Sequence, residues 1–208
     1  VKYITKEDDE DGKNEDIESI QLAFSKNDNS ANLRKTWLSD YDRNKTLDYS
    51  LKEVSIKQFI NDELIHFSAS DNVRSLPNII DGFKPSQRKV IYGCLKRNLE
   101  KEIRVAQLAG YISENCAYHH GEASLQGTIV NMAHDFVGSN NINLLEPIGQ
   151  FGTRIMGGKD SAQPRYIHTK LSPITKKLFI SQDNALYDYN NDDGLIVEPT
   201  YYVPVIPM

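Results

Sequence analysis

The sequence is short of several features, and each absence disfavours a class of protein. Only two of its 208 residues are cysteine, Cys94 and Cys116, and both lie within apolar helical patterns. We expect small buried side chains there and not a disulfide framework or a zinc site. No apolar run approaches the roughly 18–20 residues that a membrane span needs, so we expect no membrane partner.

The chain also lacks an overall positive charge, because its net charge is −5. Its charges are nevertheless segregated. Residues 1–20 hold eight acids against three lysines, and residues 178–208 hold five acids and no Lys or Arg. Residues 74–104 and residues 149–177 each carry a net charge of +5. Two basic stretches between acidic ends favour a groove for a polyanion, with solvated helix faces as the alternative.

A glycine-rich stretch at residues 149–169, GQFGTRIMGGKDSAQPRYIHT, combines four glycines with three cations and one acid. Glycines let backbone N–H groups approach an anion, and cations favour a phosphate. Tyr166 directly follows Arg165, and a tyrosine can attack phosphorus to form a covalent aryl ester. The stretch therefore predicts a phosphodiester site. The alternative is a flexible surface loop followed by a strand at residues 165–169 with a half-buried tyrosine.

Apolar spacing in the first part of the chain predicts helices. One helical pattern runs over residues 17–41 with a polar break in it, and a polar linker follows at residues 42–53. A second amphipathic helix is predicted over residues 55–67, with Ser55 as its N-cap and residues 68–72 ending it. We expect the acidic residues 5–16 to be mobile and not a metal site, because no apolar frame holds their carboxylates together.

The second part begins with a turn-rich segment at residues 74–84 and a helix that starts at Pro85. Helices are also predicted over residues 105–116 and 122–137, joined by a short turn that contains glycine. This is the form of a helix-turn-helix, whose second helix enters a DNA groove. A strand at 165–169 and a helix at 173–179 would close a wing-like unit, and an extended tail follows.

Several strings of residues, in the same order along the chain, resemble the DNA-gate region of eukaryotic type II DNA topoisomerases. They cover about residues 55–208. Two strings nearer the start resemble the end of the metal-binding Toprim domain. The DNA-gate strings are Arg74-Ser-Leu-Pro, Asp81-Gly-Phe-Lys-Pro-Ser-Gln-Arg-Lys-Val, Val105-Ala-Gln-Leu-Ala-Gly, Tyr118-His-His-Gly-Glu, Phe136-Val-Gly-Ser-Asn-Asn, Gly149-Gln-Phe-Gly-Thr-Arg, Gly157-Gly-Lys-Asp and Pro164-Arg-Tyr-Ile; the Toprim strings are Leu22-Ala-Phe-Ser-Lys and Arg34-Lys-Thr-Trp-Leu.

The resemblance implies an α+β fold that is mainly helical. Residues 1–52 would be the end of a Toprim-type domain with an acidic segment and a linker. Residues 53–208 would be a winged-helix domain that carries the catalytic tyrosine and a helix-turn-helix. The chain begins at Val1 and ends in Val-Pro-Val-Ile-Pro-Met, and we expect it to be part of a longer protein.

The resemblance also implies roles for individual residues. Tyr166 matches the nucleophile that takes a DNA 5′-phosphate and releases a 3′-hydroxyl, and Arg165 matches the arginine that stabilises the transition state. His120 and Arg74 match residues that complete the phosphate site. Residues expected to contact DNA are Arg34, Lys35, Lys84, Arg88, Tyr118, His119, Ser124 and Lys159. The alternative is a structural role for His119, and a helix-cap or core position for His120. Gln163 departs from the small residue or serine of the family and is expected to affect inhibitor contacts more than the chemistry.

The expected function is transient double-strand cleavage and religation by an ATP-dependent enzyme, with duplex DNA as substrate, in a nuclear homodimer. Mg²⁺ ligands would lie upstream of Val1, and ATP would bind a domain outside this chain, so we expect no metal site here. The chain alone should bind DNA weakly and not cleave it. The alternative is a winged-helix module that grips DNA without chemistry. A metal nuclease that uses water is disfavoured, because no convincing carboxylate cluster is present.

Overall fold

A computed structural model describes residues 1–5 and 14–208, so most of the predicted acidic segment lies outside the described residues. The chain divides into two compact units, Val1–Ser75 and Leu76–Met208. This division falls later than the predicted boundary after residue 52. The reason is that the helical run after Ser55 packs against the helices that precede it.

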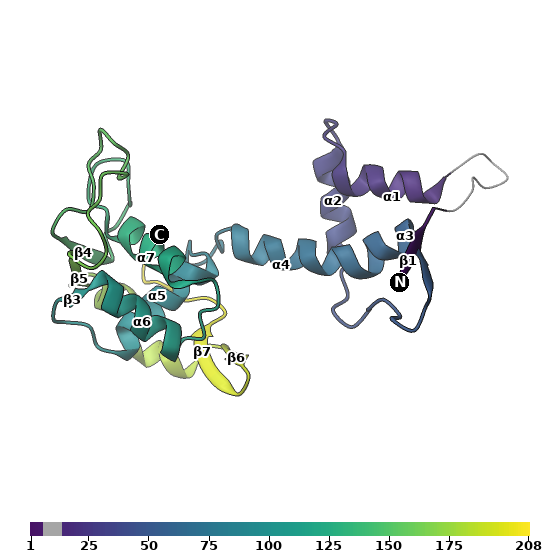
Figure 1. Cartoon of the computed structure of the whole chain (residues 1–208). Helices are drawn as coiled ribbons and strands as arrows, with labels where there is room; N and C mark the ends of the chain where they lie inside the picture. The colour runs from purple at the N-terminus through teal and green to yellow at the C-terminus, as the bar shows by residue number, and fades with distance from the viewer. Residues whose placement is uncertain (6–13) are drawn as a thin grey trace. The chain divides into compact units, whose positions relative to one another are not determined.

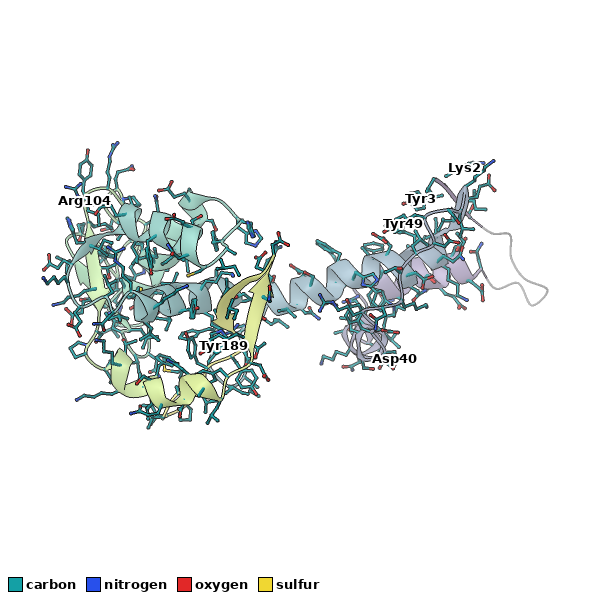
Figure 2. All side chains as sticks on the ribbon, turned by 90° about the horizontal axis from the view of Figure 1, so that it is seen from below. Lys2, Tyr3, Asp40, Tyr49, Arg104 and Tyr189 are labelled. Atoms are coloured by element: carbon teal, nitrogen blue, oxygen red, sulfur yellow. The ribbon has the colours of Figure 1, made fainter. Side chains whose placement is uncertain are left out.

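The first unit joins a short parallel sheet to helices (Figure 1). Strand β1 (Lys2–Ile4) pairs with β2 (Glu53–Ser55), and helices α1 (Glu15–Phe24) and α2 (Ser30–Ser39) lie between them in the chain. The polar break within residues 17–41 therefore separates two helices, as the spacing predicted. Tyr3 packs edge-on against Phe59, and Tyr49 lies at the same end of this unit (Figure 2).

One continuous helical run completes this unit: α3 (Ile56–Phe59), the π-helical turn η1 (Ile60–Leu64) and α4 (Ile65–Ser75). Ser55 begins it with a capping box, since its hydroxyl accepts from Gln58 N at 3.2 Å. The predicted end at residues 68–72 is wrong. Polar side chains there bond within the helix instead, with Ser68 Oγ donating to Leu64 O at 3.1 Å.

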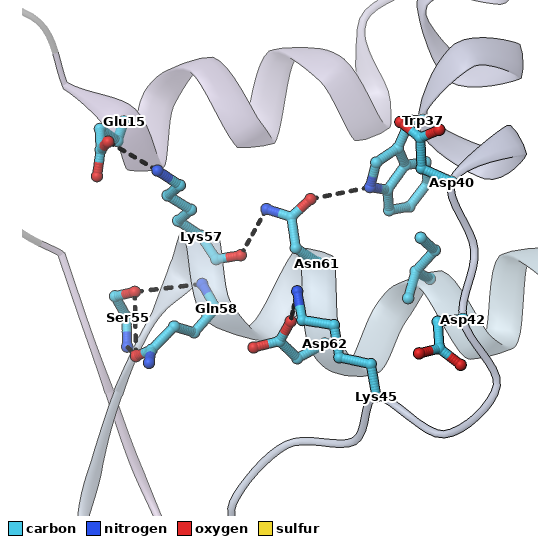
Figure 3. A pocket seen from close by; sticks show the side chains of 11 residues that line it. Glu15, Trp37, Asp40, Asp42, Lys45, Ser55, Lys57, Gln58, Asn61 and Asp62 are labelled. Carbon is cyan, nitrogen blue, oxygen red and sulfur yellow. Dashed lines mark hydrogen bonds and ion pairs between the residues drawn. The ribbon is translucent and has the colours of Figure 1, made fainter.

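A pocket of about 580 Å³ opens between α2 and this helical run (Figure 3). Trp37 Nε1 donates to Asn61 Oδ1 at 2.9 Å, and Asn61 Nδ2 donates to Lys57 O at 2.9 Å. Lys45 Nζ lies 2.7 Å from Asp62 Oδ1. The bond from Trp37 joins α2 to the helical run, and the ion pair of Lys45 joins the loop after α2 to the same run. The polar side chains that line the pocket therefore also stabilise the unit.

The second unit packs three helices beside a small antiparallel sheet (Figure 1). The helices are α5 (Pro85–Lys96), α6 (Val105–Asn115) and α7 (Glu122–Ala133). The strands β3 (Ile103–Arg104), β5 (His168–Leu171) and β4 (Leu145–Ile148) pair in that order. The helix start at Pro85 and the helix pair α6–α7 are confirmed, although α7 ends four residues before the predicted residue 137.

The core of this unit lies between the three helices and the sheet, where side chains from each helix are fully buried. Cys94 and Cys116 are free and buried, as predicted, and burial raises the pKa of the Cys116 thiol to about 11. The remaining elements follow β5 in the chain. They are α8 (Thr175–Leu178), a 3-10 turn η2 (Ser181–Ala185) and the hairpin of β6 (Tyr189–Asp192) and β7 (Leu195–Pro199).

Candidate functional site

The glycine-rich stretch is the connection between the paired strands β4 and β5. The antiparallel register places Ile148 opposite His168, so residues 149–167 form one long hairpin loop. The predicted strand at 165–169 is displaced toward the C-terminus, since β5 begins only at His168. Arg165 and Tyr166 therefore lie in a turn at the end of the loop and not within the sheet.

Tyr166 is exposed while the backbone around it is anchored. Its side chain is 66% exposed, whereas the next residue, Ile167, is 2% exposed and belongs to the core. Tyr166 N donates to Gln163 O at 2.9 Å, and Val105 N donates to Ile167 O at 3.0 Å. The alternative prediction of a half-buried tyrosine is therefore wrong: the phenol of Tyr166 is exposed to solvent, and its backbone is held by hydrogen bonds.

Arg165 lies against Tyr166. Its guanidinium carbon is 5.0 Å from the centroid of the phenol ring. A guanidinium presents donors in a planar fork that matches two phosphate oxygens. The pair can therefore hold a phosphodiester and place a nucleophile next to it.

The loop itself is closed by its own backbone. Gly158 N donates to Thr153 O at 2.9 Å, and Asp160 accepts from Thr153 N at 2.8 Å and from Thr153 Oγ1 at 2.9 Å. The backbone hydrogen bond from Thr153 is the main reason why the pKa of Asp160 is lowered. Nearer the stem, Ala162 N donates to Gln150 O at 2.8 Å. The loop is thus an ordered structure whose C-terminal stem leads directly into Arg165 and Tyr166.

Gly152 is required for this closure. A Cβ on Gly152 would lie 2.6 Å from Gly158 Cα, and its φ of +104° is a conformation that other residues rarely adopt. We expect Gly152→Ala to raise hydrogen exchange at the amides of Thr153 and Gly158 by about tenfold or more, because both hydrogen bonds are lost. Gly157→Ala is the control, since its φ of +59° also disfavours alanine but a Cβ there meets nothing within 4 Å, so the comparison isolates the clash. Equal exchange in both variants would contradict this packing.

The start of α7 gathers a second group of predicted residues. Gly121, with φ +86°, turns the chain into the helix. Ser124 is exposed in the first turn, and Tyr118 Oη donates to its hydroxyl at 3.1 Å. His120 is exposed, and its ring meets that of Tyr118 edge-on at 5.6 Å. Free N–H groups at a helix start bind phosphate well, so this turn suits an anion.

Two of the predicted DNA contacts are corrected by the structure. Arg88 is 4% exposed, and its guanidinium bonds Asp81 at 2.7 and 2.9 Å and Phe83 O at 3.1 Å, so it belongs to the core. Tyr118 is 6% exposed, its hydroxyl donates to Ser124 Oγ, and its ring packs against that of His120. Because both side chains are buried, neither is available to contact DNA.

The other predicted contacts are distributed over both units. In the second unit Lys84 and Lys159 are exposed, and His119 Nε2 lies 3.1 Å from Asp192 Oδ2 on β6. In the first unit Lys35 is exposed on α2, beside a half-buried Arg34 whose Nη1 donates to Ser25 O at 2.8 Å. Arg74 is on α4 and not in an extended segment, and it pairs with Asp71 at 3.2 Å. Their roles toward DNA stay predictions.

Sequence reasoning missed the strand β4 and the residue His134. His134 follows α7 and lies against Gly158 of the glycine-rich loop. Nothing in its local sequence marks it, because the contact depends on a loop about twenty residues away. The proline at position 147 hid β4, since proline is rare within strands and is tolerated mainly at a sheet edge, where β4 lies.

Two negative findings apply to the described residues alone. Within residues 1–5 and 14–208, no group of three or more His, Cys, Asp or Glu side chains could hold a metal ion. Across the same part of the chain, none of the helices has the length and apolar character needed to cross a membrane.

Comparison with known protein families gives two matches that together span most of the chain. The family model for the A subunit of DNA gyrase/topoisomerase IV matches residues 74–208. The model described as the C-terminal associated domain of TOPRIM matches residues 3–72. The junction between the two matches lies close to the division between the two compact units.

Comparison with individual proteins points the same way. The chain is 56% identical over 193 residues to DNA topoisomerase 2 of Saccharomyces cerevisiae and 54% identical over 201 residues to that of Arabidopsis thaliana. These matches cover 93% and 97% of the chain but 13% of each relative, so the chain spans about an eighth of their length.

A crystal structure of the Plasmodium falciparum topoisomerase II DNA-binding, cleavage and re-ligation domain is similar as well. It matches with a TM-score of 0.79 and 54% sequence identity. The match covers 92% of this chain and 26% of that one.

Proposed function

This chain belongs to the type II DNA topoisomerase family, and from that premise we propose that it supplies the DNA-cleaving tyrosine of a longer enzyme. The substrate is duplex DNA, and the reaction is transient double-strand cleavage and religation. The observation that carries the proposal is the pairing of an exposed Tyr166 with Arg165 on an anchored backbone. A module that only grips DNA does not need a phenol held in this way.

The reaction balances without a consumed co-reactant. The phenolic oxygen of Tyr166 attacks the phosphorus, and a bond to it forms while the bond from phosphorus to the 3′-oxygen breaks. The phenol loses its proton, and the 3′-oxygen gains one to leave as a 3′-hydroxyl. The phosphorus stays joined to Tyr166 and to the 5′-oxygen of the nucleotide that follows the cut. Because the aryl ester conserves the bond energy, attack by the 3′-hydroxyl reverses every step and religates the strand.

The residues of this chain assist at named atoms. Arg165 clamps the non-bridging oxygens and lowers the energy of the extra charge that develops on them. His120, exposed before α7, is proposed to hydrogen-bond the phosphate or to carry the proton. Lys84, Lys159 and the first turn of α7 are proposed to bind neighbouring phosphates.

Replacement of Arg165 tests the clamp. We expect Arg165→Ala in the intact protein to slow formation of the covalent complex by about 10²–10³-fold at saturating DNA, as for loss of one transition-state donor. Arg154→Ala is the control, because Arg154 is another exposed arginine of the same loop. A rapid-quench assay with end-labelled duplex measures the rate. Equal rates of covalent-complex formation in the two variants would show that Arg165 does not stabilise the transition state.

The remaining parts of the reaction are proposed on the family alone. Mg²⁺ would favour departure of the 3′-oxygen, with ligands from a part of the longer protein upstream of Val1. ATP would bind another domain and drive passage of a second duplex. Removal of divalent ions with a chelator should stop cleavage by the intact protein; undiminished cleavage would contradict the proposal.

A homodimer would place two tyrosines on the two DNA strands, and a monomeric intact protein in sedimentation analysis would exclude it. A nuclear location is proposed as well, and imaging of the tagged intact protein outside the nucleus would contradict it.

The chemistry of the DNA ends tests the proposed function. Cleaved DNA should have free 3′-hydroxyl ends that a polymerase extends, and 5′ ends that resist a 5′ exonuclease even after protease digestion, because a peptide stays linked to the 5′-phosphate through its tyrosine. Free 5′-phosphate ends would instead indicate hydrolysis by water. Tight binding without any cleavage would favour the alternative, a winged-helix module that binds DNA without chemistry.

A further inference from the structure

His134 is a buried side chain that the proposed chemistry does not use. It follows α7 directly and is 7% exposed. Among the described residues its Nε2 atom is buried and has no hydrogen-bond partner. A buried polar atom without a partner costs stability, so a ring that is kept in this position needs an explanation.

The imidazole ring has two close neighbours. It meets the ring of Phe136, with the centroids 5.0 Å apart and the planes inclined by 36°. Its outer edge is close to the backbone of Gly158, where an added Cβ would lie 2.4 Å from Cε1 and 2.8 Å from Nε2 of His134. Only a glycine allows the loop to approach the ring this closely, and its φ of +81° also favours glycine.

The backbone of His134 is fixed independently of its side chain. Its carbonyl oxygen accepts from Ser139 Oγ at 3.1 Å and from Asn140 Nδ2 at 2.9 Å. The ring is therefore a rigid support that projects from the end of α7 and on which Gly158 rests.

This contact joins the two halves of the candidate site. The first turn of α7, at Ser124, suits a phosphate, and a helix is a stiff element. The far end of α7 carries His134, which touches Gly158 of the loop that leads into Arg165 and Tyr166. The ring of His134 thus sets how closely the loop can approach the end of the helix.

We propose that His134 is a positioning residue, whose buried ring seats the glycine-rich loop on α7 and so aligns Arg165 and Tyr166 with the phosphate bound at the start of that helix. The inference rests on the proposed function. His134 itself touches neither DNA nor the phenol. Its effect is on alignment, and a displacement of about 1 Å in a reacting group can cost about 10²-fold in rate.

Two substitutions in the intact protein separate packing from the chemistry of the nitrogen atoms. His134→Ala removes the support, and we expect formation of the covalent complex at saturating DNA to slow by about tenfold or more, with the Kd for duplex DNA within about twofold of the parent. His134→Met fills about the same volume against Gly158 and Phe136 without a ring nitrogen, so its rate should stay within about threefold of the parent. A His134→Ala variant that cleaves at the parent rate, or a Met variant as slow as the Ala variant, overturns the inference.

Hydrogen exchange distinguishes positioning from general destabilisation. In His134→Ala the amides of residues 157–160 should exchange faster, while those of Leu125 and Ile129 in the core of α7 stay protected. Faster exchange throughout α7 would overturn the inference, because the ring would then be a structural residue only.

Gly158→Ala carries the test if His134→Ala fails to fold. Its methyl group would push the loop away from an intact ring, so the same slow cleavage with unchanged DNA affinity is expected, and a parent-like rate overturns the inference. The parent protein separates the two proposals. No covalent capture by the parent refutes the proposed function, whereas normal capture by the parent together with normal capture by these variants refutes only the role of His134.

Discussion

Tyr166→Phe is expected to abolish covalent capture of DNA and to leave the affinity for duplex DNA within about twofold of the parent. The phenylalanine ring fills the same space, so the contact with Arg165 at 5.0 Å and the anchored backbone are kept. What is lost is the oxygen that forms the bond to phosphorus. Removal of a catalytic nucleophile costs about 10⁶-fold in well-studied hydrolases, so the covalent product should fall below detection.

This experiment needs the intact protein and a matched control. Tyr201→Phe removes a hydroxyl from another exposed tyrosine of the same unit, which is 39% exposed. Covalent capture by the control should equal that of the parent. If Tyr166→Phe lost its affinity for DNA, Tyr166 would be a binding residue. If it still captured DNA, another residue would be the nucleophile.

Arg88→Met is expected to lower the free energy of unfolding of the second unit by about 3–5 kcal/mol, as found when one partner of a buried ion pair is removed. Arg88 Nε lies 2.7 Å from Asp81 Oδ2, and the two side chains are 5% and 0% exposed. Asp81 also accepts from Phe83 N at 2.9 Å and from Tyr202 N at 2.9 Å. The substitution leaves this carboxylate buried without its cation, and it loosens the attachment of the C-terminal segment to α5.

Lys84→Met is the matched control, because Lys84 is an exposed cation one helical turn earlier. Its effect should stay within about 0.5 kcal/mol. The one tryptophan, Trp37, lies in the first unit, so its fluorescence does not report on this change. Hydrogen exchange at the core amides of α5–α7 measures the free energy of unfolding of the second unit directly. If Arg88→Met lowered that free energy by less than about 1 kcal/mol, water would have to reach the Asp81 carboxylate.

Arg88 also shows the limit of reading charges from a sequence. The residue stands in a basic stretch beside Lys84 and Lys89, and nothing local distinguishes a solvated arginine from a buried one. Arg88 is buried because the turn before α5 places Asp81 within hydrogen-bond distance of its guanidinium. The C-terminal segment also bonds Asp81, through Tyr202 N. Local rules did fix the helix itself, because Pro85 suits a first helical position and the apolar spacing marks the buried face.

The same contrast holds for the candidate site. The glycines, the cations and the Arg165–Tyr166 pair are visible in the sequence, and the structure places them in one ordered loop, whereas the pair was predicted in a strand. The strand boundary was misplaced because β4 and β5 define each other by pairing across that loop. The continuous helix to Ser75 was missed because local helix propensity is a weak signal that tertiary packing overrides, and this helical run packs against α1 and α2.

The most direct test of the central claim is to identify the residue that becomes linked to DNA. The intact protein is incubated with end-labelled duplex and Mg²⁺, denatured quickly and digested, and the DNA-linked peptide is sequenced by mass spectrometry. If Tyr166 is the nucleophile, there is a single linkage, a 5′-phosphate on the oxygen of Tyr166. A linkage to any other residue, or free 5′-phosphate ends without a linked peptide, would contradict this claim.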